Sequence, residues 1–291
     1  MILLYIIGLI AVGVMLILQY LTRKTAGSFV TRLISGVILV LLALLIICSG
    51  GWILFAAALV LSLIGMSELF RALGIRKEKK PDRLELVGYL AAVLYYVFIG
   101  FLPARVGWLG ILAALILILG VYVFSFPSYT IDQIKNLVFA VIYVAVMLSC
   151  VYLIRIMNNG QYIVWLIFLS AWGSDTCAYC AGMLFGKHKM TPVLSPKKTI
   201  EGAIGGVAGA VILGLLYSLF TTHQTTAFML ICLVGAGVSM IGDLSASAIK
   251  RQTGIKDYGT LIPGHGGILD RFDSVIFTAP VVYLMAQLLV K

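Results

Sequence analysis

Charged and hydroxyl side chains near the C-terminus have the spacing of a metal and phosphate site. On a helix, one carboxylate, one hydroxyl and two cations would share a face, because they follow at i, i+4, i+7 and i+8: Asp243, Ser247, Lys250 and Arg251. Asp270 and Asp273 could project toward that face. Alone, this pair would only complement a helix dipole, worth ~0.3–1 kcal/mol. With the other groups nearby, it predicts a Mg²⁺ site that is shared with substrate phosphates.

A glycine-rich turn lies between these groups. Gly266 and Gly267 have no side chain, so their backbone N–H groups could approach phosphate oxygens closely. His265 could act as a general base, but phosphoryl-type transfer depends mainly on positioning and charge stabilisation. We therefore expect His265 to contact phosphate or the metal's ligands, and Lys256 and Arg271 to contact phosphate.

An earlier cluster begins at Asp175. This carboxylate lies in an apolar run, where it is costly unless it faces a cation, a partner or water; an ordinary interhelical hydrogen bond is the alternative. Further on, the hydroxyls of Ser195 and Thr199 could cap the helix that follows, while Lys197 and Lys198 meet an anion near its positive end. A solvated basic loop is the alternative for this segment.

The composition places both clusters in a membrane protein. Of the 291 residues, 62% are hydrophobic and 11% are charged, and the mean hydropathy is +1.11, which is too apolar for one water-exposed globular domain. A spanning helix needs ~20 mostly apolar residues. We predict an all-α, polytopic integral membrane bundle of about ten helices, or nine if one is miscounted, at residues 2–21, 29–48, 51–70, 86–103, 106–124, 137–155, 161–184, 202–220, 226–244 and 274–290.

The basic residues predict the orientation of these helices. The basic residues concentrate in every second connection between the predicted spans. Of the 21, all but Arg105, Arg155 and Lys291 lie there. By the positive-inside rule, these connections are cytoplasmic. We read the net charge of +10 in this way, and we expect no nucleic-acid partner because aromatic residues are not interleaved with the basic ones. The first run has no basic residue ahead of it, so we expect a retained span and not a signal peptide.

The polar residues divide the chain into two regions. Residues 1–160 form about six spans with few polar side chains. Residues 161–291 form a catalytic transmembrane region with cytoplasmic loops at 185–201 and 245–273. We therefore expect a multi-pass protein of the cell membrane whose site faces the cytoplasm.

The stretch from Ser247 to Asp273 resembles the signature of the phosphatidate cytidylyltransferases, or CDP-diacylglycerol synthases. The matching residues are Ser247-Ala-Ile-Lys250-Arg251, Lys256-Asp257-Tyr258-Gly259 and Ile262-Pro-Gly-His265-Gly-Gly-Ile-Leu-Asp270-Arg271-Phe-Asp273. The cluster from Asp175 to Gly202 is similar to a second motif of that family, and Arg32-Leu-Ile-Ser35-Gly36 is similar to its usual beginning. The run at 2–21 is an addition to the family pattern.

The resemblance implies condensation of CTP with phosphatidic acid in the bilayer, giving CDP-diacylglycerol and pyrophosphate. It implies a requirement for Mg²⁺, with a second cation left open, and it leaves the oligomeric state open, a homodimer included. We assign catalysis to Asp243, Asp270, Lys250, Arg251 and His265, and metal binding to Asp243, Asp270, Asp273 and Asp175. Contacts to substrate phosphate are assigned to Ser195, Lys197, Lys198, Thr199, Ser247, Lys256, Gly266, Gly267 and Arg271.

Two other functions compete with this interpretation. A CTP-dependent polyprenol or dolichol kinase would also combine carboxylates with lysines, but it would transfer the γ-phosphate and leave CDP. A small-solute transporter predicts charges near the bilayer midplane and helix breaks in both halves. Transport is disfavoured because residues 1–160 are expected to be nearly free of buried charge.

Overall fold

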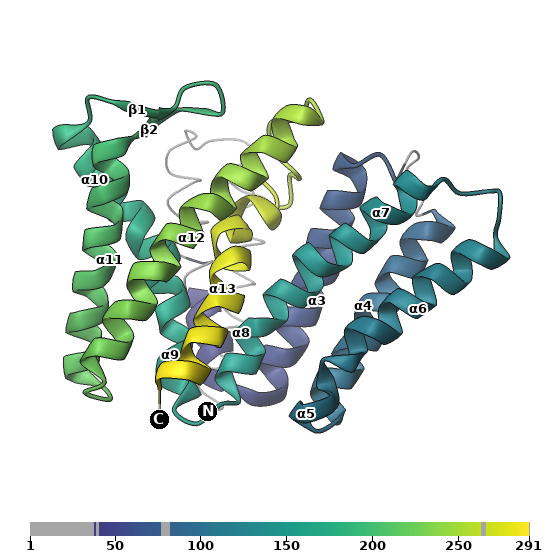
Figure 1. Ribbon diagram of the computed structural model, residues 1–291, viewed down its shortest axis with the longest axis horizontal. Coiled ribbons are helices and arrows are strands. Elements are labelled where there is room, and N and C mark those ends of the chain that lie inside the picture. The colour runs from purple at the N-terminus through teal and green to yellow at the C-terminus, as the bar shows by residue number, and fades with distance from the viewer. Residues whose placement is uncertain (1–37, 39–40, 77–81, 263–265, 291) are drawn as a thin grey trace.

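Long apolar helices make up most of the chain (Figure 1). The computed structural model describes residues 38, 41–76, 82–262 and 266–290. Eight helical segments among these residues are long and apolar enough to cross a membrane. They are Gly51–Ala72, Arg83–Phe101, Arg105–Phe124, Ile131–Arg155, Gly160–Phe185, Ile200–Phe220, Thr225–Gln252 and Leu269–Leu289.

These segments confirm the predicted all-α membrane bundle. Each coincides with one of the last eight predicted runs, because about twenty apolar residues in succession leave the backbone no partner in lipid except its own helix. The predicted run at 2–21 lies outside the described residues. Of the run at 29–48, only residues 38 and 41–48 are described, and residues 41–49 are helical.

The segments divide into helices with the following labels. In the first part of the chain they are α3 (Gly51–Ala72), α4 (Arg83–Phe101), α5 (Ala104–Gly107), α6 (Leu109–Phe124), α7 (Ile131–Ala140), η1 (Val141–Val146) and α8 (Met147–Arg155). In the second part they are α9 (Gly160–Phe168), η2 (Leu169–Gly173), α10 (Ser174–Phe185), α11 (Ile200–Phe220), α12 (Thr225–Gln252) and α13 (Leu269–Leu289).

Two of the spans contain a π-helical turn. Hydropathy predicts a helix at both places but does not report the wider turn. η1 carries Tyr143, and η2 ends directly before Ser174 and Asp175. π turns are frequent at functional sites. Their position at Tyr143 and directly before Asp175 therefore indicates a functional site near these two residues.

The predicted loop 185–201 contains a small antiparallel sheet, which the all-α prediction omitted. Strands β1 (Lys189–Thr191) and β2 (Ser195–Thr199) form a hairpin with Lys189 opposite Thr199. Glu201 fixes the base of this hairpin, because its carboxylate accepts the backbone N–H groups of Lys187 and His188 and lies 2.6 Å from the His188 Nδ1. The hairpin is therefore attached to the first turn of α11.

Helix α11 begins with the cap that the sequence predicts, and its glycines pack against α10. The Thr199 hydroxyl accepts the N–H of Gly202 at 3.2 Å, which confirms a helix cap in this segment. Glycines on α11 then lie against α10, where a Cβ at Gly206 would be 2.9 Å from the Ser174 carbonyl oxygen. The missing side chains let the two helices approach closely.

The polar connections gather at one end of the bundle, at the top of Figure 1. The hairpin, the end of α12 and the beginning of α13 lie there, and so does the end of α3. We call this the site end. Helix α5, which contains Arg105, and the end of α8, which is formed by Arg155, lie toward the other end.

Candidate functional site

In the C-terminal cluster from Asp243 to Asp273, all the carboxylates and cations except Lys256 and Asp257 lie on two packed helices, α12 and α13. Helix α12 continues to Gln252, past its predicted end at residue 244, so it carries both Asp243 and Lys250 on one continuous helix. Helix α13 begins at Leu269 and carries Asp270 in its first turn. The Lys250 Nζ donates to the Asp270 Oδ1 at 2.8 Å, so the structure brings the two helices of the signature together.

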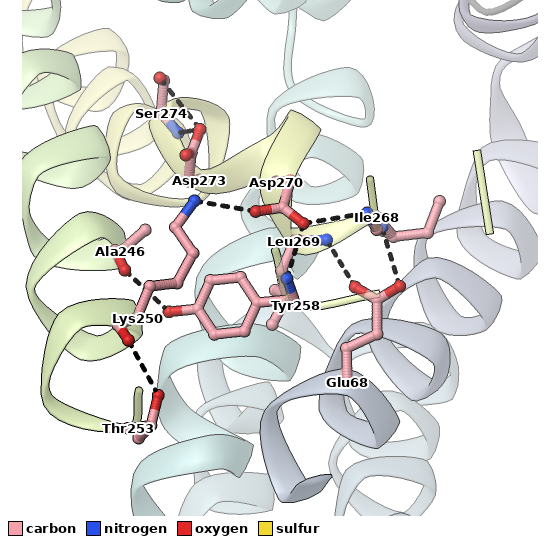
Figure 2. A network of polar contacts seen from close by, with 11 residues as sticks. Glu68, Ala246, Lys250, Thr253, Tyr258, Ile268, Leu269, Asp270, Asp273 and Ser274 are labelled. Carbon is pink, nitrogen blue, oxygen red and sulfur yellow. Dashed lines mark hydrogen bonds and ion pairs between the residues drawn. The ribbon is translucent and has the colours of Figure 1, made fainter. Parts of the chain in front are cut away.

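Asp270 accepts hydrogen bonds from three directions (Figure 2). Its Oδ2 accepts the N–H of Tyr258 at 2.8 Å and the N–H of Gly267 at 2.9 Å, while Oδ1 faces Lys250. The side chain is only 3% exposed, and charge-assisted bonds of this kind are strong. Asp270 therefore ties α12, the connection that follows it and α13 into one unit.

Tyr258 supports this unit from the connection between α12 and α13. Its hydroxyl donates to the carbonyl oxygen of Ala246 at 3.1 Å, and the Lys250 Nζ lies 5.4 Å from its ring centroid. Burial raises the pKa of the Tyr258 hydroxyl, so it stays a neutral donor at physiological pH. The contact holds the connection against α12 beside the lysine that binds Asp270.

Asp243 forms an ion pair with Lys198 of strand β2. Both side chains line a cavity of about 360 Å³ between α10, the hairpin, α11 and α12. Asp175, Lys197 and Thr199 line the same cavity. The structure therefore joins the Asp175 cluster to the C-terminal signature, as a shared site requires.

A third carboxylate lies beside these two. Asp273 accepts the N–H of Ser274 at 2.7 Å and is close enough to Asp243 and Asp175 to interact with both electrostatically. Asp175 lies near the Ser274 side chain as well. Carboxylates from α10, α12 and α13 thus face one another, and such a group needs cations to offset its mutual repulsion.

The chemistry of these carboxylates is compatible with a divalent ion that is bound together with phosphate groups. Among the residues that the structure describes, no three His, Cys, Asp or Glu side chains form a preformed metal cage. Mg²⁺ does not require one, since it usually binds one or two carboxylates together with phosphates and water. The hard oxygen donors of Asp243, Asp270 and Asp273 match that preference, and two of them now have lysine partners.

The other predicted phosphate contacts lie at the site end. Lys197, Arg251, Lys256 and Arg271 are exposed, whereas Ser195 and Ser247 are partly buried. Gly266 donates its N–H to the carbonyl oxygen of Ile262, and Gly267 donates to Asp270. Phosphate binding by those two N–H groups stays a prediction, and it would require them to change partners. His265 lies outside the described residues.

Side chains from the first half of the chain also reach the site, and the sequence reasoning missed them. Glu68 reaches the site through Ile268 and Leu269. The expectation that residues 1–160 are nearly free of buried charge was wrong, because Glu68 is buried and so is Glu85, which pairs with Arg76 instead. The ring of Tyr143 is buried, and its hydroxyl interacts electrostatically with Asp273 and Asp243. A carboxylate inside an apolar run was the available signal for Glu68.

The fold and the site together define a class of protein. Apolar helices of membrane length, with carboxylates and lysines gathered at one end, form a polytopic membrane protein with a site suited to a hard cation and phosphate groups. The sequence profile of the Cytidylyltransferase family matches residues 30–289. The chain therefore belongs to the Cytidylyltransferase family.

Curated relatives agree with this membership. A phosphatidate cytidylyltransferase of Staphylococcus epidermidis is 33% identical over 264 residues, which cover 87% of this chain and 97% of the relative. Proteins of the same name from Staphylococcus aureus and Staphylococcus saprophyticus are 32% and 31% identical over 263 residues, with the same coverage. The similarity thus extends over both halves of the chain.

Proposed function

We propose that this protein is a CTP:phosphatidate cytidylyltransferase that converts CTP and phosphatidic acid to CDP-diacylglycerol and pyrophosphate. Membership of the family and the names of the relatives support this assignment. The observation that carries it is the hydrogen bond between Lys250 and Asp270, which joins the two helices of the signature at a membrane-boundary site.

The site end faces the cytoplasm in this proposal, where CTP is available. The basic residues support this orientation, because they concentrate at the site end and positive residues are retained on the cytoplasmic side. The protein is accordingly a multi-pass protein of the cell membrane.

The two substrates reach this site from different phases. Lys197, Lys198 and Thr199 line the polar cavity together with Asp243 and are suited to the phosphates of CTP. Ala203 and Met240 border both this cavity and an apolar groove of about 620 Å³ between α11 and α12. The groove suits the acyl chains of phosphatidic acid, whose headgroup would then lie beside the carboxylates.

The reaction joins two phosphates without a covalent enzyme intermediate. An oxygen of the phosphatidate attacks the α-phosphorus of CTP, and the bond from that phosphorus to the pyrophosphate oxygen breaks. The attacking phosphate is already anionic, so no general base is needed. Lys198, Lys250 and Arg251 lie at the site to stabilise the charge that develops.

Asp243 and Asp270 would hold Mg²⁺, with Asp273 and Asp175 beside them. When bound, the ion would neutralise charge on the reacting phosphates and on the departing pyrophosphate. Substrate phosphates would then take over Lys198 and Lys250, which now pair with the two carboxylates. This exchange of partners keeps the charges at the site balanced before and after binding.

The test is product analysis with purified protein in phosphatidate-containing vesicles. CTP labelled in the cytidine or in the α-phosphate should transfer its label to lipid in the presence of Mg²⁺, and CTP labelled in the γ-phosphate should release labelled pyrophosphate. Transfer of γ-label to a polyprenol, with CDP left behind, would refute the proposal and indicate a kinase.

A further inference from the structure

Glu68 of α3 lies against the first turn of α13, 200 residues further along the chain (Figure 2). Its Oε1 accepts the N–H of Ile268 at 3.0 Å, and its Oε2 accepts the N–H of Leu269 at 2.9 Å. The side chain is 1% exposed. Both oxygens of a buried carboxylate are therefore directed at two successive N–H groups.

These two N–H groups belong to the helix end that carries Asp270. The first N–H groups of a helix have no partner within it, so an acceptor from elsewhere must satisfy them when they are buried. Asp270 accepts the N–H groups of Tyr258 and Gly267, and Glu68 accepts the next two. At this helix end, the N–H of Gly267 is therefore accepted by Asp270, and the N–H groups of Ile268 and Leu269 are accepted by Glu68.

The contact with Glu68 also accounts for two glycines of the signature. A Cβ at Gly267 would lie 2.5 Å from both carboxylate oxygens of Glu68, and a Cβ at Gly259 would overlap Oε1. Neither glycine has the positive φ that Gly266 adopts. Space for the Glu68 carboxylate, and not backbone conformation, requires glycine at these two positions.

We propose that Glu68 is a positioning residue for the transfer reaction: it holds the first turn of α13 so that Asp270 stays directed at Lys250. This inference rests on the proposed function. A role in stability alone would lower the amount of folded protein and leave the turnover of each folded molecule unchanged.

Glu68→Gln tests the contact with little change in shape. An amide has a single acceptor oxygen, so its NH₂ group would face one of the two backbone N–H groups. The loss of one bond to a charged group corresponds to roughly a 10- to 100-fold effect. We expect kcat to fall by about that factor and the Mg²⁺ concentration for half-maximal rate to rise. We expect the KM for phosphatidic acid to change less than about twofold, because Glu68 is remote from the apolar groove.

Glu85→Gln is the matched control. Glu85 is also a buried carboxylate with two side-chain donors, Arg76 and Tyr89. It lies on α4, and both of its donors lie outside α12 and α13. Its replacement should lower the melting temperature without changing the Mg²⁺ dependence of the folded enzyme.

A double-variant cycle tests the contact with Gly267. Gly267→Ala alone should impair activity because the new methyl group meets Glu68. Once Glu68→Ala has removed the carboxylate, the same methyl group has room. In the Glu68→Ala background, the loss of activity caused by Gly267→Ala should be at least about fivefold smaller than the loss it causes in the wild type. Additive effects would contradict the packing on which the proposal depends.

Hydrogen exchange of the segment 266–270 completes the experiment. In Glu68→Gln this segment should exchange faster than in the wild type and in Glu85→Gln, because one N–H group loses its acceptor. Unchanged exchange, or faster exchange with unchanged kcat and Mg²⁺ dependence, would overturn the positioning role. A wild type that forms no CDP-diacylglycerol would instead refute the proposed function, and the exchange data would still report on the contact.

Discussion

Asp270→Asn should nearly abolish turnover while leaving the protein folded in the membrane. The carboxylate accepts Lys250 on one oxygen and two backbone N–H groups on the other. An asparagine that directs its oxygen at the N–H groups of Tyr258 and Gly267 must direct its NH₂ group at the Lys250 ammonium. The substitution therefore removes one charge-assisted hydrogen bond and one negative charge.

The two consequences differ in size. Removing one partner of a buried ion pair costs about 3–5 kcal/mol, which does not exceed the roughly 5–15 kcal/mol by which folded proteins are stable. The loss of a group that stabilises transition-state charge lowers kcat by about 10²–10³-fold. We therefore expect folded, membrane-integrated protein that has lost at least about 99% of its activity.

The assay compares label transfer from CTP to phosphatidic acid in proteoliposomes with the melting temperature in detergent. Asp132→Asn is the control, because Asp132 forms an exposed pair with Lys135 on α7, away from the site. It should leave both quantities unchanged, since exposed pairs contribute little. Near-normal transfer by Asp270→Asn would remove Asp270 from the mechanism and refute this reasoning.

Three further predictions concern the ion pairs and the metal. Lys198→Met should raise the KM for CTP about tenfold or more, because Lys198 lines the cavity and pairs with Asp243; an unchanged KM in initial-rate measurements would exclude it from nucleotide binding. Removal of divalent ions with EDTA should abolish transfer, and added Mg²⁺ should restore it; full activity after chelation would contradict the metal proposal. Arg76→Met should leave the buried Glu85 carboxylate without its charged partner and lower stability by about 3–5 kcal/mol in denaturant titrations. The turnover of the protein that remains folded should not change, and a fall in turnover would link this pair to the site.

The membrane fold could be predicted because it depends on local composition. Runs of about twenty apolar residues form spanning helices whatever lies elsewhere in the chain, and each of the eight that the structure describes matched a predicted run. The hairpin at 189–199 was missed because its short strands have no apolar alternation that would distinguish them from a basic loop. The π turns were missed because they change the helix without changing its hydropathy.

The site could be predicted only in part. The spacing of Asp243 and Lys250 placed them on one helix, and the structure confirms that arrangement. The partners that order the site depend on tertiary structure: Glu68 meets Leu269 across 201 positions, and Lys198 reaches Asp243 from the hairpin. Spacing along the chain does not report such contacts, although a carboxylate inside an apolar span was a reason to examine Glu68.

The most direct test of the central claim is a structure of the protein with CTP and Mn²⁺ in place of Mg²⁺, in which anomalous scattering locates the metal. The proposal predicts a metal peak within coordinating distance of both Asp243 and Asp270 and in contact with the phosphates of CTP. A metal bound elsewhere, or coordinated by neither carboxylate, would contradict it.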